Sequence, residues 1–203
     1  MHGAEAVVTN CTFLNVPCVS KRRFPKQYRT HVLDSKLRRE RTKLEAKVMH
    51  RAKTTGTLCP FVLNVDLEKC EIIQTKLNGT ALVDYLSTAS RSPTSSAGST
   101  RMLKKAGEQL GRLHNARISH GDSTTSNFMV VGKEVYLFDF GLSEFDSSIE
   151  NQAIDLLLFS KSVSPAQFQT FLKGYKKICG KNDTKRLLVQ VKEIQSRARY
   201  VER

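Results

Sequence analysis

Residues 120–141, HGDSTTSNFMVVGKEVYLFDFG, hold the polar side chains of this chain that are best suited to chemistry. Two short apolar runs, 128–131 and 135–138, flank Gly132-Lys133-Glu134, a pattern that predicts a β-hairpin with a three-residue loop. Such a loop sets Phe128 opposite Phe138. The residues on either side of this pair would then meet at the open end of the hairpin.

Those residues are Asn127 and Asp139, and their types favour a metal site. Mg²⁺ prefers hard oxygen ligands, takes few of them from protein and completes its shell with phosphate and water. Asp122, on the loop that enters the hairpin, is expected to reach the same place. We therefore predict that Asn127 and Asp139 bind Mg²⁺ beside a second carboxylate.

The spacing of these residues resembles the catalytic loop and metal motif of protein kinases, H-x-D-x-x-x-x-N followed by D-F-G. The matching positions are His120, Asp122, Asn127, Asp139, Phe140 and Gly141. Six fixed positions rarely coincide by chance. The alternative interpretation, a plain turn before a hairpin, would require far fewer of these residues. The match predicts phosphoryl transfer from ATP, with Asp122 orienting or deprotonating the attacking hydroxyl or water.

Phosphoryl transfer also needs a cation for the phosphates and an acid on a helix to hold that cation. Lys21 ends a predicted strand and Glu45 lies within the helix that follows, so we predict this pair. The alternative is a surface ion pair of Glu45 with Arg41, one helical turn earlier. Gly3 is the candidate for close backbone approach to the phosphates.

Composition excludes several other classes of protein. The 203 residues have a hydrophobic fraction of 39%, enough for a packed core, and no apolar run long enough to cross a membrane. No secretory signal is visible at the N-terminus. The five cysteines are scattered without C-x-x-C spacing, which argues against a zinc site or a disulfide scaffold and indicates a reducing compartment, the cytoplasm or the nucleus.

The net charge of +14 is concentrated in two blocks. Residues 21–53 carry 13 Lys and Arg against 3 acidic residues, and residues 173–203 carry 10 against 3. Solvated helix faces would explain such runs, but two blocks around a near-neutral middle favour a polyanionic partner. Few aromatic residues interleave with them, so a folded RNA contacted through its backbone fits better than a single strand.

The elements that must position the site divide the chain unevenly. We predict strands at 7–8, 13–19, 61–65 and 71–76, with a helix from Asp34 as N-cap to about Lys53 whose apolar stripe is Leu37, Leu44, Val48 and Ala52. A short helix at 81–86 and a flexible loop at 87–100 follow, and then mostly helices. Among them, Ser164 and Gln167 predict a capping box, Gly180 a helix end, and a last helix begins near Thr184. The pattern indicates an α+β protein with two lobes.

Longer strings of residues resemble the atypical kinase/ATPase subunit of the KEOPS (EKC) complex, the PRPK-type family. They are GAEA at 3–6, SKRRFPKQYR at 20–29, RERTKLEA at 39–46, HGDSTTSN at 120–127, DFGLS at 139–143 and a basic tail. The resemblance implies a reduced bilobal protein-kinase-like fold without a long activation segment. It implies an N-lobe at 1–77 and a C-lobe at 78–203.

The same resemblance implies the roles of individual residues. Lys21 would contact the phosphates of ATP and Glu45 would hold Lys21, while Gln74 and Leu77 would bound the adenine-contacting hinge. Asp122 would be the catalytic base. From its position alone, on the helix that follows, we expect Asp155 to tie down the catalytic loop. The tail residues Arg197, Arg199 and Arg203 would contact tRNA or a partner. The expected setting is the tRNA threonylcarbamoyladenosine (t6A) pathway, with a threonylcarbamoyltransferase subunit and other KEOPS subunits as partners.

Some positions depart from the pattern, and two alternative functions stay open. Ser20, Ser123 and Thr124 replace an aliphatic residue, a leucine and the lysine of protein kinases, and the last of these leaves protein-kinase efficiency in doubt. Gly121 replaces the arginine on which activation-loop control depends. The alternatives are a small-molecule kinase of the aminoglycoside or choline type, and a non-catalytic adaptor that binds tRNA and a partner.

Overall fold

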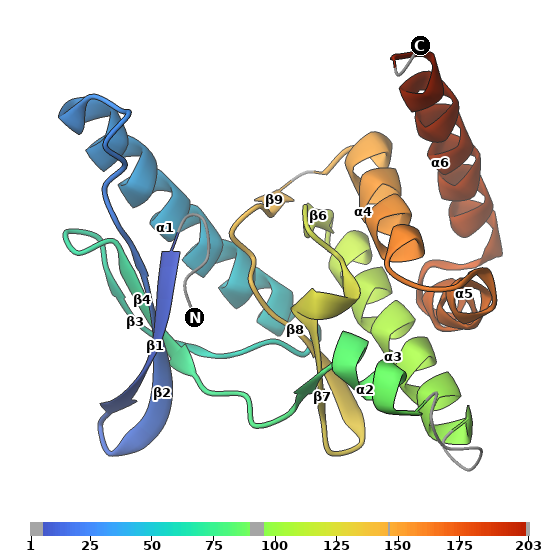
Figure 1. Ribbon diagram of the computed structural model, residues 1–203, viewed down its shortest axis with the longest axis horizontal. Coiled ribbons are helices and arrows are strands. Elements are labelled where there is room, and N and C mark those ends of the chain that lie inside the picture. Colours follow the sequence, from blue (N-terminus) through green and yellow to red (C-terminus); the bar gives the residue numbers. More distant parts are fainter. Residues whose placement is uncertain (1–5, 90–95, 146, 202–203) are drawn as a thin grey trace.

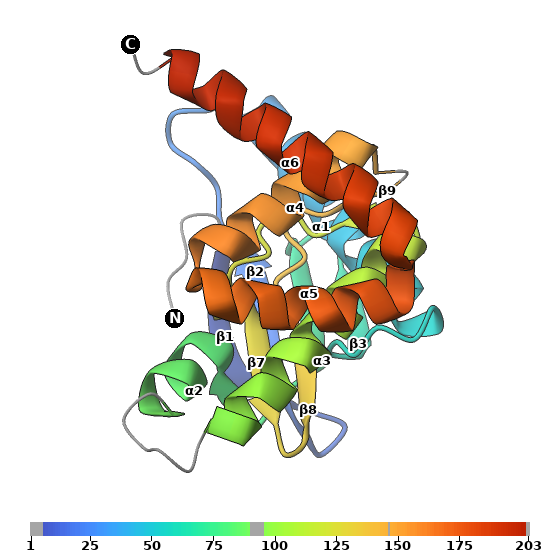
Figure 2. The same cartoon turned by 90° about the vertical axis from the view of Figure 1, so that its right-hand side faces the viewer.

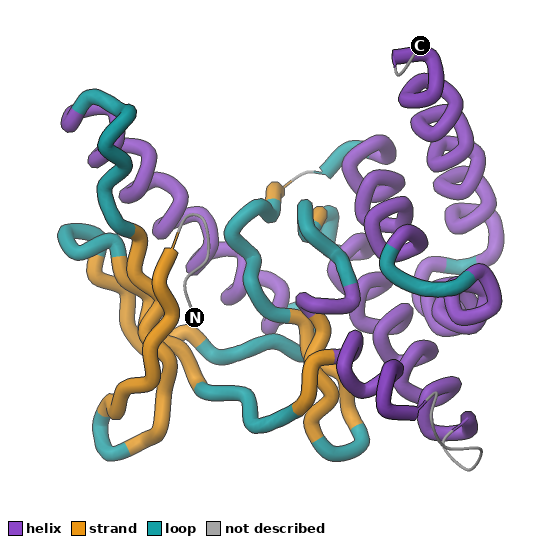
Figure 3. The backbone as a smooth tube through the Cα atoms, in the orientation of Figure 1, coloured by secondary structure: helices purple, strands orange, loops and turns teal. Residues whose placement is uncertain are grey.

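The computed structural model describes residues 6–89, 96–145 and 147–201. Figure 1 shows two parts, a strand-rich part with one long helix and a part dominated by helices, and Figure 3 shows the same division by type of element. Residues 76–79 join them as an extended segment between the last strand of the first part and the first strand of the second. The predicted α+β organisation is confirmed.

The first part is a four-stranded antiparallel sheet of order β1-β2-β4-β3. Its strands are β1 (Ala6–Phe13), β2 (Val16–Arg23), β3 (Val62–Asp66) and β4 (Glu71–Thr75). The predicted break at Thr9-Asn10 is wrong: β1 runs through it, and the chain turns at Leu14 and Asn15, whose φ angles are 48° and 62°. Two positive φ angles suit the tightest hairpin turn. Lys21 consequently lies within β2, paired with Val8 on one side and Ile72 on the other, instead of at its end.

Helix α1 (His31–Thr54) packs against this sheet. Its N-cap is Thr30, and the predicted cap Asp34 lies in the first turn. Asp34 is buried and accepts from the Lys26 amide at 3.1 Å and from Arg38 Nε at 2.6 Å. The hydrogen bond from Arg38 lowers the pKa of this carboxyl, which therefore fastens the preceding loop as an anion. The helix buries Thr42, Glu45, Val48, Met49 and Ala52, whereas the predicted Leu44 is exposed.

The second part begins with a small sheet of order β5-β7-β8, formed by β5 (Thr80–Ala81), β7 (Phe128–Val131) and β8 (Glu134–Leu137). The hairpin was predicted correctly but its register was not. Val131 pairs with Glu134 and Phe128 with Leu137, so the loop has two residues, Gly132 and Lys133. Gly132 has a φ of 59°, which a two-residue hairpin loop requires and glycine adopts freely.

Helices make up most of the rest of the second part. They are α2 (Leu82–Ala89), α3 (Ser96–Asn115), α4 (Ile149–Lys161), α5 (Pro165–Cys179) and α6 (Lys181–Val201). The capping box at Ser164 and Gln167 and the helix end at Gly180 are as predicted, but α6 begins at Lys181, ahead of Thr184. Within 87–100, α2 continues to Ala89 and α3 starts at Ser96, so the predicted loop is largely helical where it is described; residues 90–95 lie outside the described residues.

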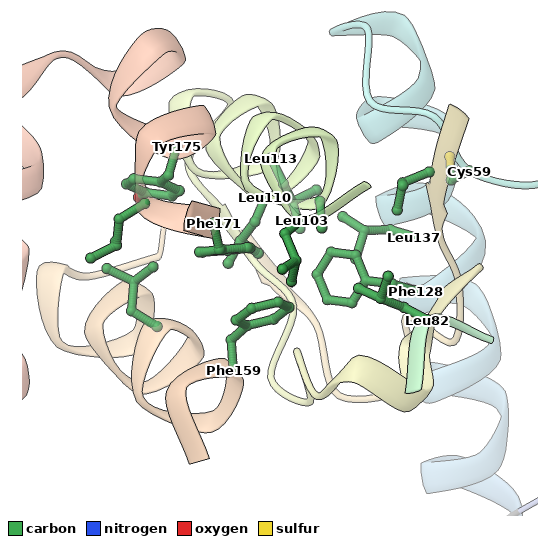
Figure 4. Packing of buried hydrophobic residues seen from close by; sticks show 14 of the residues in the cluster. Cys59, Leu82, Leu103, Leu110, Leu113, Phe128, Leu137, Phe159, Phe171 and Tyr175 are labelled. Atoms are coloured by element: carbon green, nitrogen blue, oxygen red, sulfur yellow. The ribbon is translucent and has the colours of Figure 1, made fainter. Parts of the chain in front are cut away.

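The main core lies between α3, α4, α5 and the β7–β8 hairpin, as Figure 4 shows. The Phe159 and Phe171 rings stack there with centroids 3.8 Å apart. Figure 2 shows α5 crossing α3, and their backbones nearly touch. A Cβ on Gly174 of α5 would lie 1.9 Å from the Lys104 carbonyl oxygen of α3. Only glycine permits this close approach, which fixes the position of α3 against α5.

The segment after Asp139-Phe140-Gly141 is short. It is followed by β9 (Glu144–Phe145), which pairs with the earlier strand β6 (Ile118–Ser119), and α4 begins at Ile149. The prediction that no long activation segment is present is confirmed. Across the part of the chain that is described, none of the helices has the length and apolar character needed to span a bilayer.

Candidate active site

A cavity of about 730 Å³ lies between the two parts of the molecule. The sheet supplies one wall through Val8, Val19 and Lys21, and the other wall comes from the second part through Asp122, Met129 and Asp139. The cavity is thus apolar over much of its surface and ionic at one place. Such a combination suits a ligand with a flat apolar portion and an anionic portion.

Lys21 connects the two walls. Its Nζ is 2.7 Å from Glu45 Oε1 on α1 and 2.6 Å from Asp139 Oδ1 beyond β8. The Lys21 side chain is 8% exposed and that of Glu45 2%. The alternative pairing of Glu45 with Arg41 on the helix surface is therefore wrong, because Glu45 faces inward toward Lys21. The predicted Lys21–Glu45 pair is present.

Glu45 binds a second cation that was not predicted. Its other oxygen, Oε2, is 2.6 Å from Arg23 Nη2, and Arg23 is 3% exposed. Arg23 also lines the cavity. The signal in the sequence was the spacing Lys-x-Arg, since residues two apart on a strand face the same side of the sheet.

Asp122 and Asn127 are held together on the catalytic loop. Asn127 closes the short 3-10 helix η2 (Thr125–Asn127), and its Nδ2 donates to Asp122 Oδ2 at 2.9 Å and to the Asp122 carbonyl at 2.8 Å. The predicted pairing of Asn127 with Asp139 is wrong because of the register: the Asn127 carbonyl accepts from the Phe138 amide instead. The carboxylates of Asp122 and Asp139 still reach one cavity.

Asp139 leaves β8 in an unusual backbone conformation, with a φ of 62°. This turns the chain out of the strand and directs the carboxylate toward Lys21 rather than along the hairpin. Partial burial by itself would raise the pKa of Asp139, but the charge and hydrogen bond of Lys21, together with the Gly141 amide, lower this pKa below its usual value. The side chain is 51% exposed. Asp139 is therefore an ionised and accessible carboxylate.

The side chains of this site supply only some of the ligands that a magnesium ion needs. Among the described residues, no group of three or more His, Cys, Asp or Glu side chains could hold a metal. The Asn127 Nδ2 is turned toward Asp122, which leaves its Oδ1 as the oxygen that a hard cation would take. Magnesium commonly binds one or two carboxylates and takes its other ligands from water and substrate phosphates.

Asp155 of α4 holds the catalytic loop from behind. Its carboxylate is buried and accepts from the His120 amide at 2.7 Å, the Gly121 amide at 2.9 Å and His114 Nε2 at 3.0 Å. Its carbonyl accepts from Ser123 Oγ at 2.6 Å. Burial would raise the pKa of Asp155, but the hydrogen bond from His114 and its other partners lower it. The prediction from its position alone that Asp155 ties down this loop agrees with these contacts.

His120 is fully buried, and burial lowers its pKa below the usual value. The ring is therefore neutral at physiological pH. Its Nε2 is 3.1 Å from the Phe138 carbonyl and its Nδ1 is 3.3 Å from the Asp122 amide. An amide can only donate and a carbonyl only accept, so the hydrogen belongs on Nε2. His120 thus links the catalytic loop to the residue before Asp139.

The remaining predicted positions differ in what can be said of them. Gln74 and Leu77 line the cavity, at the end of β4 and in the segment that joins the two parts. Arg197 lies on α6 and contacts Glu150 at 3.1 Å, far from any cavity residue in sequence. Gly3 and Arg203, and the side chain of Arg199, lie outside the described residues.

The fold and the arrangement of Lys21, Glu45, Asp122 and Asp139 define a protein of the kinase-like class. Residues 20–175 match the model of the lipopolysaccharide kinase (Kdo/WaaP) family. The solved structure of WaaP in complex with acyl carrier protein has a TM-score of 0.65 to this chain, covering 97% of it and 86% of WaaP at 14% identity. At that identity the likeness concerns the fold alone.

Curated relatives narrow the class. The KEOPS complex subunit Bud32 of Pyrococcus abyssi is 35% identical over 99% of this chain and 95% of its own length. The probable serine/threonine-protein kinase BUD32 homolog of Archaeoglobus fulgidus is 33% identical over 91% and 89%. A probable bifunctional tRNA threonylcarbamoyladenosine biosynthesis protein of Methanobrevibacter smithii is 35% identical, and the chain spans 36% of its length. The chain belongs to the Kdo/WaaP kinase-like family and, by these relatives, to the Bud32 family.

Proposed function

We propose that this protein is a Mg²⁺- and ATP-dependent phosphotransferase or ATPase, an atypical serine/threonine kinase subunit of a KEOPS-type assembly that supports the t6A modification of tRNA. The observation that carries the proposal is the position of Lys21 Nζ, which lies between the carboxylates of Glu45 and Asp139 at the wall of a cavity that Asp122 also lines. A buried cation between two acids beside an ATP-sized space suits a triphosphate.

The chain would act as two lobes, 1–77 and 78–203, that close on the nucleotide. The apolar wall of Val8, Val19 and Met129 suits the adenine ring, next to the hinge from Gln74 to Leu77. Lys21, steadied by Glu45, would neutralise charge on the phosphates. Asn127 and Asp139 would hold magnesium, which supplies further positive charge at the phosphate oxygens.

Asp122 would orient the attacking hydroxyl or water and accept its proton. Its carboxylate is already oriented by Asn127 Nδ2, and the loop that carries it is fixed by Asp155 through two backbone amides. Positioning of this kind supplies much of the rate in phosphoryl transfer, where little covalent chemistry falls to the protein. Thr124 replaces the lysine of protein kinases, so hydrolysis, with water as acceptor, demands less of this site than transfer to a protein hydroxyl.

The proposed partners follow from the relatives and the charge. The relatives carry the names of a KEOPS subunit and of a bifunctional t6A biosynthesis protein, which supports a threonylcarbamoyltransferase subunit and other KEOPS subunits as partners. The basic blocks at 21–53 and 173–203 suit the tRNA backbone, and the tail with Arg197, Arg199 and Arg203 would contact tRNA or that partner. We expect such an assembly to work in the cytoplasm or the nucleus.

The decisive experiment follows γ-labelled ATP with the protein alone and with purified partner and tRNA, measuring free phosphate and protein-bound label separately. The Asp122→Ala variant should retain nucleotide binding and lose turnover. Asp183→Ala, which removes an exposed carboxylate on α6, is the matched control and should keep both. Undiminished turnover in Asp122→Ala would refute the assigned role.

The same assay separates the alternatives. A non-catalytic adaptor would bind tRNA equally well without Mg-ATP and would show no hydrolysis even in the assembled complex. A small-molecule kinase would phosphorylate an aminoglycoside or choline from a substrate panel. None of the three relatives described above is named for such a substrate, and two are named for the KEOPS complex or for t6A biosynthesis. Their names therefore favour the tRNA-modification role.

A further inference from the structure

Arg23 is a buried cation whose hydrogen-bonding capacity is mostly unused. Its Nη2 donates to Glu45 Oε2, but its Nε and Nη1 are buried and have no partner among the described residues. A guanidinium has five N–H donors and cannot lose its charge in a protein. Leaving buried donors of a charged group without acceptors is costly, so the site as it stands lacks an acceptor.

The surroundings of Arg23 point to where that acceptor comes from. Arg23 lines the same cavity as Lys21, because the two side chains lie on one face of β2. A Cβ placed on Gly141 would lie 3.4 Å from both Arg23 Nη2 and Lys21 Nζ. The two cations therefore flank one point beside Gly141, where a side chain would contact both of them.

Lys21, Arg23, Glu45 and Asp139 form a cluster whose charges are balanced while Asp139 contacts Lys21. Lys21 and Arg23 face Glu45 and Asp139, two positive groups against two negative ones. Glu45 is shared, with one oxygen for each cation. If Asp139 bound a metal ion instead of Lys21, Lys21 and Arg23 would keep Glu45 as their only acid, and one of their two positive charges would be left for a ligand in the cavity.

We propose that Arg23 is a second phosphate-binding cation, whose incompletely paired guanidinium donates to an anionic phosphate group of the nucleotide held by Lys21. This inference rests on the proposed nucleotide site and adds a residue to it. The planar guanidinium suits two oxygens of one phosphate, whereas the ammonium of Lys21 acts as a point charge. Glu45 would serve both cations and keep them apart at a fixed spacing.

The test measures binding rather than turnover. Titration calorimetry would compare Mg-ATP, Mg-ADP and adenosine on the wild type, Arg23→Gln and Arg23→Lys. Arg23→Gln should weaken Mg-ATP binding by about 10- to 100-fold, the worth of one or two charge-assisted hydrogen bonds, and leave adenosine unchanged. Arg23→Lys keeps the charge, protects folding and should lose less.

Arg22→Gln is the matched control. Arg22 is the neighbour of Arg23 on β2, and its replacement removes the same charge. The side chain is exposed and lies over the Phe24 ring, 5.2 Å from its centroid. Its Mg-ATP affinity should equal that of the wild type. An equal loss in Arg22→Gln and Arg23→Gln would overturn the proposal, because the effect would then reflect overall charge.

Repeating the measurement in a Lys21→Met variant distinguishes phosphate binding by Arg23 from a role in orienting Glu45. If Arg23 acted only by orienting Glu45 for Lys21, Arg23→Gln would cost nothing further once Lys21→Met has removed that lysine. The proposal predicts a further loss of about 10-fold in the double variant. No further loss overturns it.

The outcomes also separate this inference from the proposed function. A wild type that binds neither Mg-ATP nor Mg-ADP would refute the nucleotide site itself. A wild type that binds Mg-ATP, with Arg23→Gln binding it equally, would refute the role of Arg23 alone. Competition by inorganic phosphate as strong as that by ATP would overturn the assignment to a nucleotide phosphate.

Discussion

Replacing Asp155 by asparagine tests whether the catalytic loop depends on one buried carboxylate. The two oxygens of Asp155 accept from the amides of His120 and Gly121 and from His114 Nε2. Asparagine has almost the same shape but offers one oxygen and one NH₂ group. Whichever way the amide turns, at least one N–H donor of the loop or of His114 faces another donor.

The expected cost follows from these contacts. Loss of a charge-assisted acceptor costs about 1.5–3 kcal/mol, and a buried donor left without an acceptor costs about 1–3 kcal/mol more. Because Asp155 is completely buried, water cannot replace the lost acceptor. We expect Asp155→Asn to lower the free energy of unfolding by about 3–5 kcal/mol and, for a domain of this size, the Tm by roughly 10 °C.

Urea denaturation followed by circular dichroism would measure the change. Asp183→Asn is the control, since Asp183 is 69% exposed and its only ion pair, with Arg186, is 4.0 Å long among the described residues; it should change stability by less than about 0.5 kcal/mol. A loss below about 1 kcal/mol in Asp155→Asn would refute the account of the loop given above.

Three further predictions concern helix packing, pH and salt. Gly174→Ala should destabilise the protein by about 3 kcal/mol or more in urea denaturation, because the new Cβ would lie 1.9 Å from the Lys104 carbonyl oxygen. The control Gly98→Ala should be neutral or stabilising by about 1 kcal/mol, because its Cβ would meet only the Tyr85 hydroxyl, at 2.9 Å. Burial lowers the folded-state pKa of His120, so the unfolded chain binds its proton first, and the free energy of unfolding should fall by up to about 1.4 kcal/mol per pH unit as the pH drops below about 6.5. The carboxyl groups of Asp139 and Asp155 have lowered pKa values, so their protonation lowers stability only at more acidic pH. An unchanged slope in His120→Gln would contradict the assignment to His120. The tRNA affinity should fall steeply with salt concentration in filter-binding assays and fall again when residues 197–203 are removed; a flat dependence would leave the basic blocks as solvated surface.

The local patterns of the sequence predicted the elements that local chemistry builds. The capping box at Ser164, the helix end at Gly180 and the strands flanking residues 67–70 depend on neighbours within a few positions, and the structure contains them. The errors came where two local solutions compete. Asp34 is as good an N-cap as Thr30 by residue type, but a buried contact with Arg38 and the Lys26 amide uses its carboxylate elsewhere.

The hairpin at 128–137 shows how small an error of this kind can be. Both a two-residue and a three-residue loop fit the apolar runs, and the choice shifts the partner of Phe128 by one position. Because alternate residues of a strand face opposite sides, that single step decides which side chains meet. It places Asn127 opposite Phe138 instead of Asp139, and the Asn127 side chain bonds to Asp122.

The amino-acid sequence alone determined which groups are available for chemistry, since the types and order of Lys21, Glu45, Asp122, Asn127 and Asp139 are legible without coordinates. The pair of Lys21 and Glu45 was predicted from the sequence, whereas only the tertiary structure decided the other partners. Lys21 meets Asp139 across 118 residues of chain, and Glu45 divides its two oxygens between Lys21 and Arg23. Contacts between such distant positions arise from the packing of whole elements and from the burial of charge, and no local spacing in the chain encodes either.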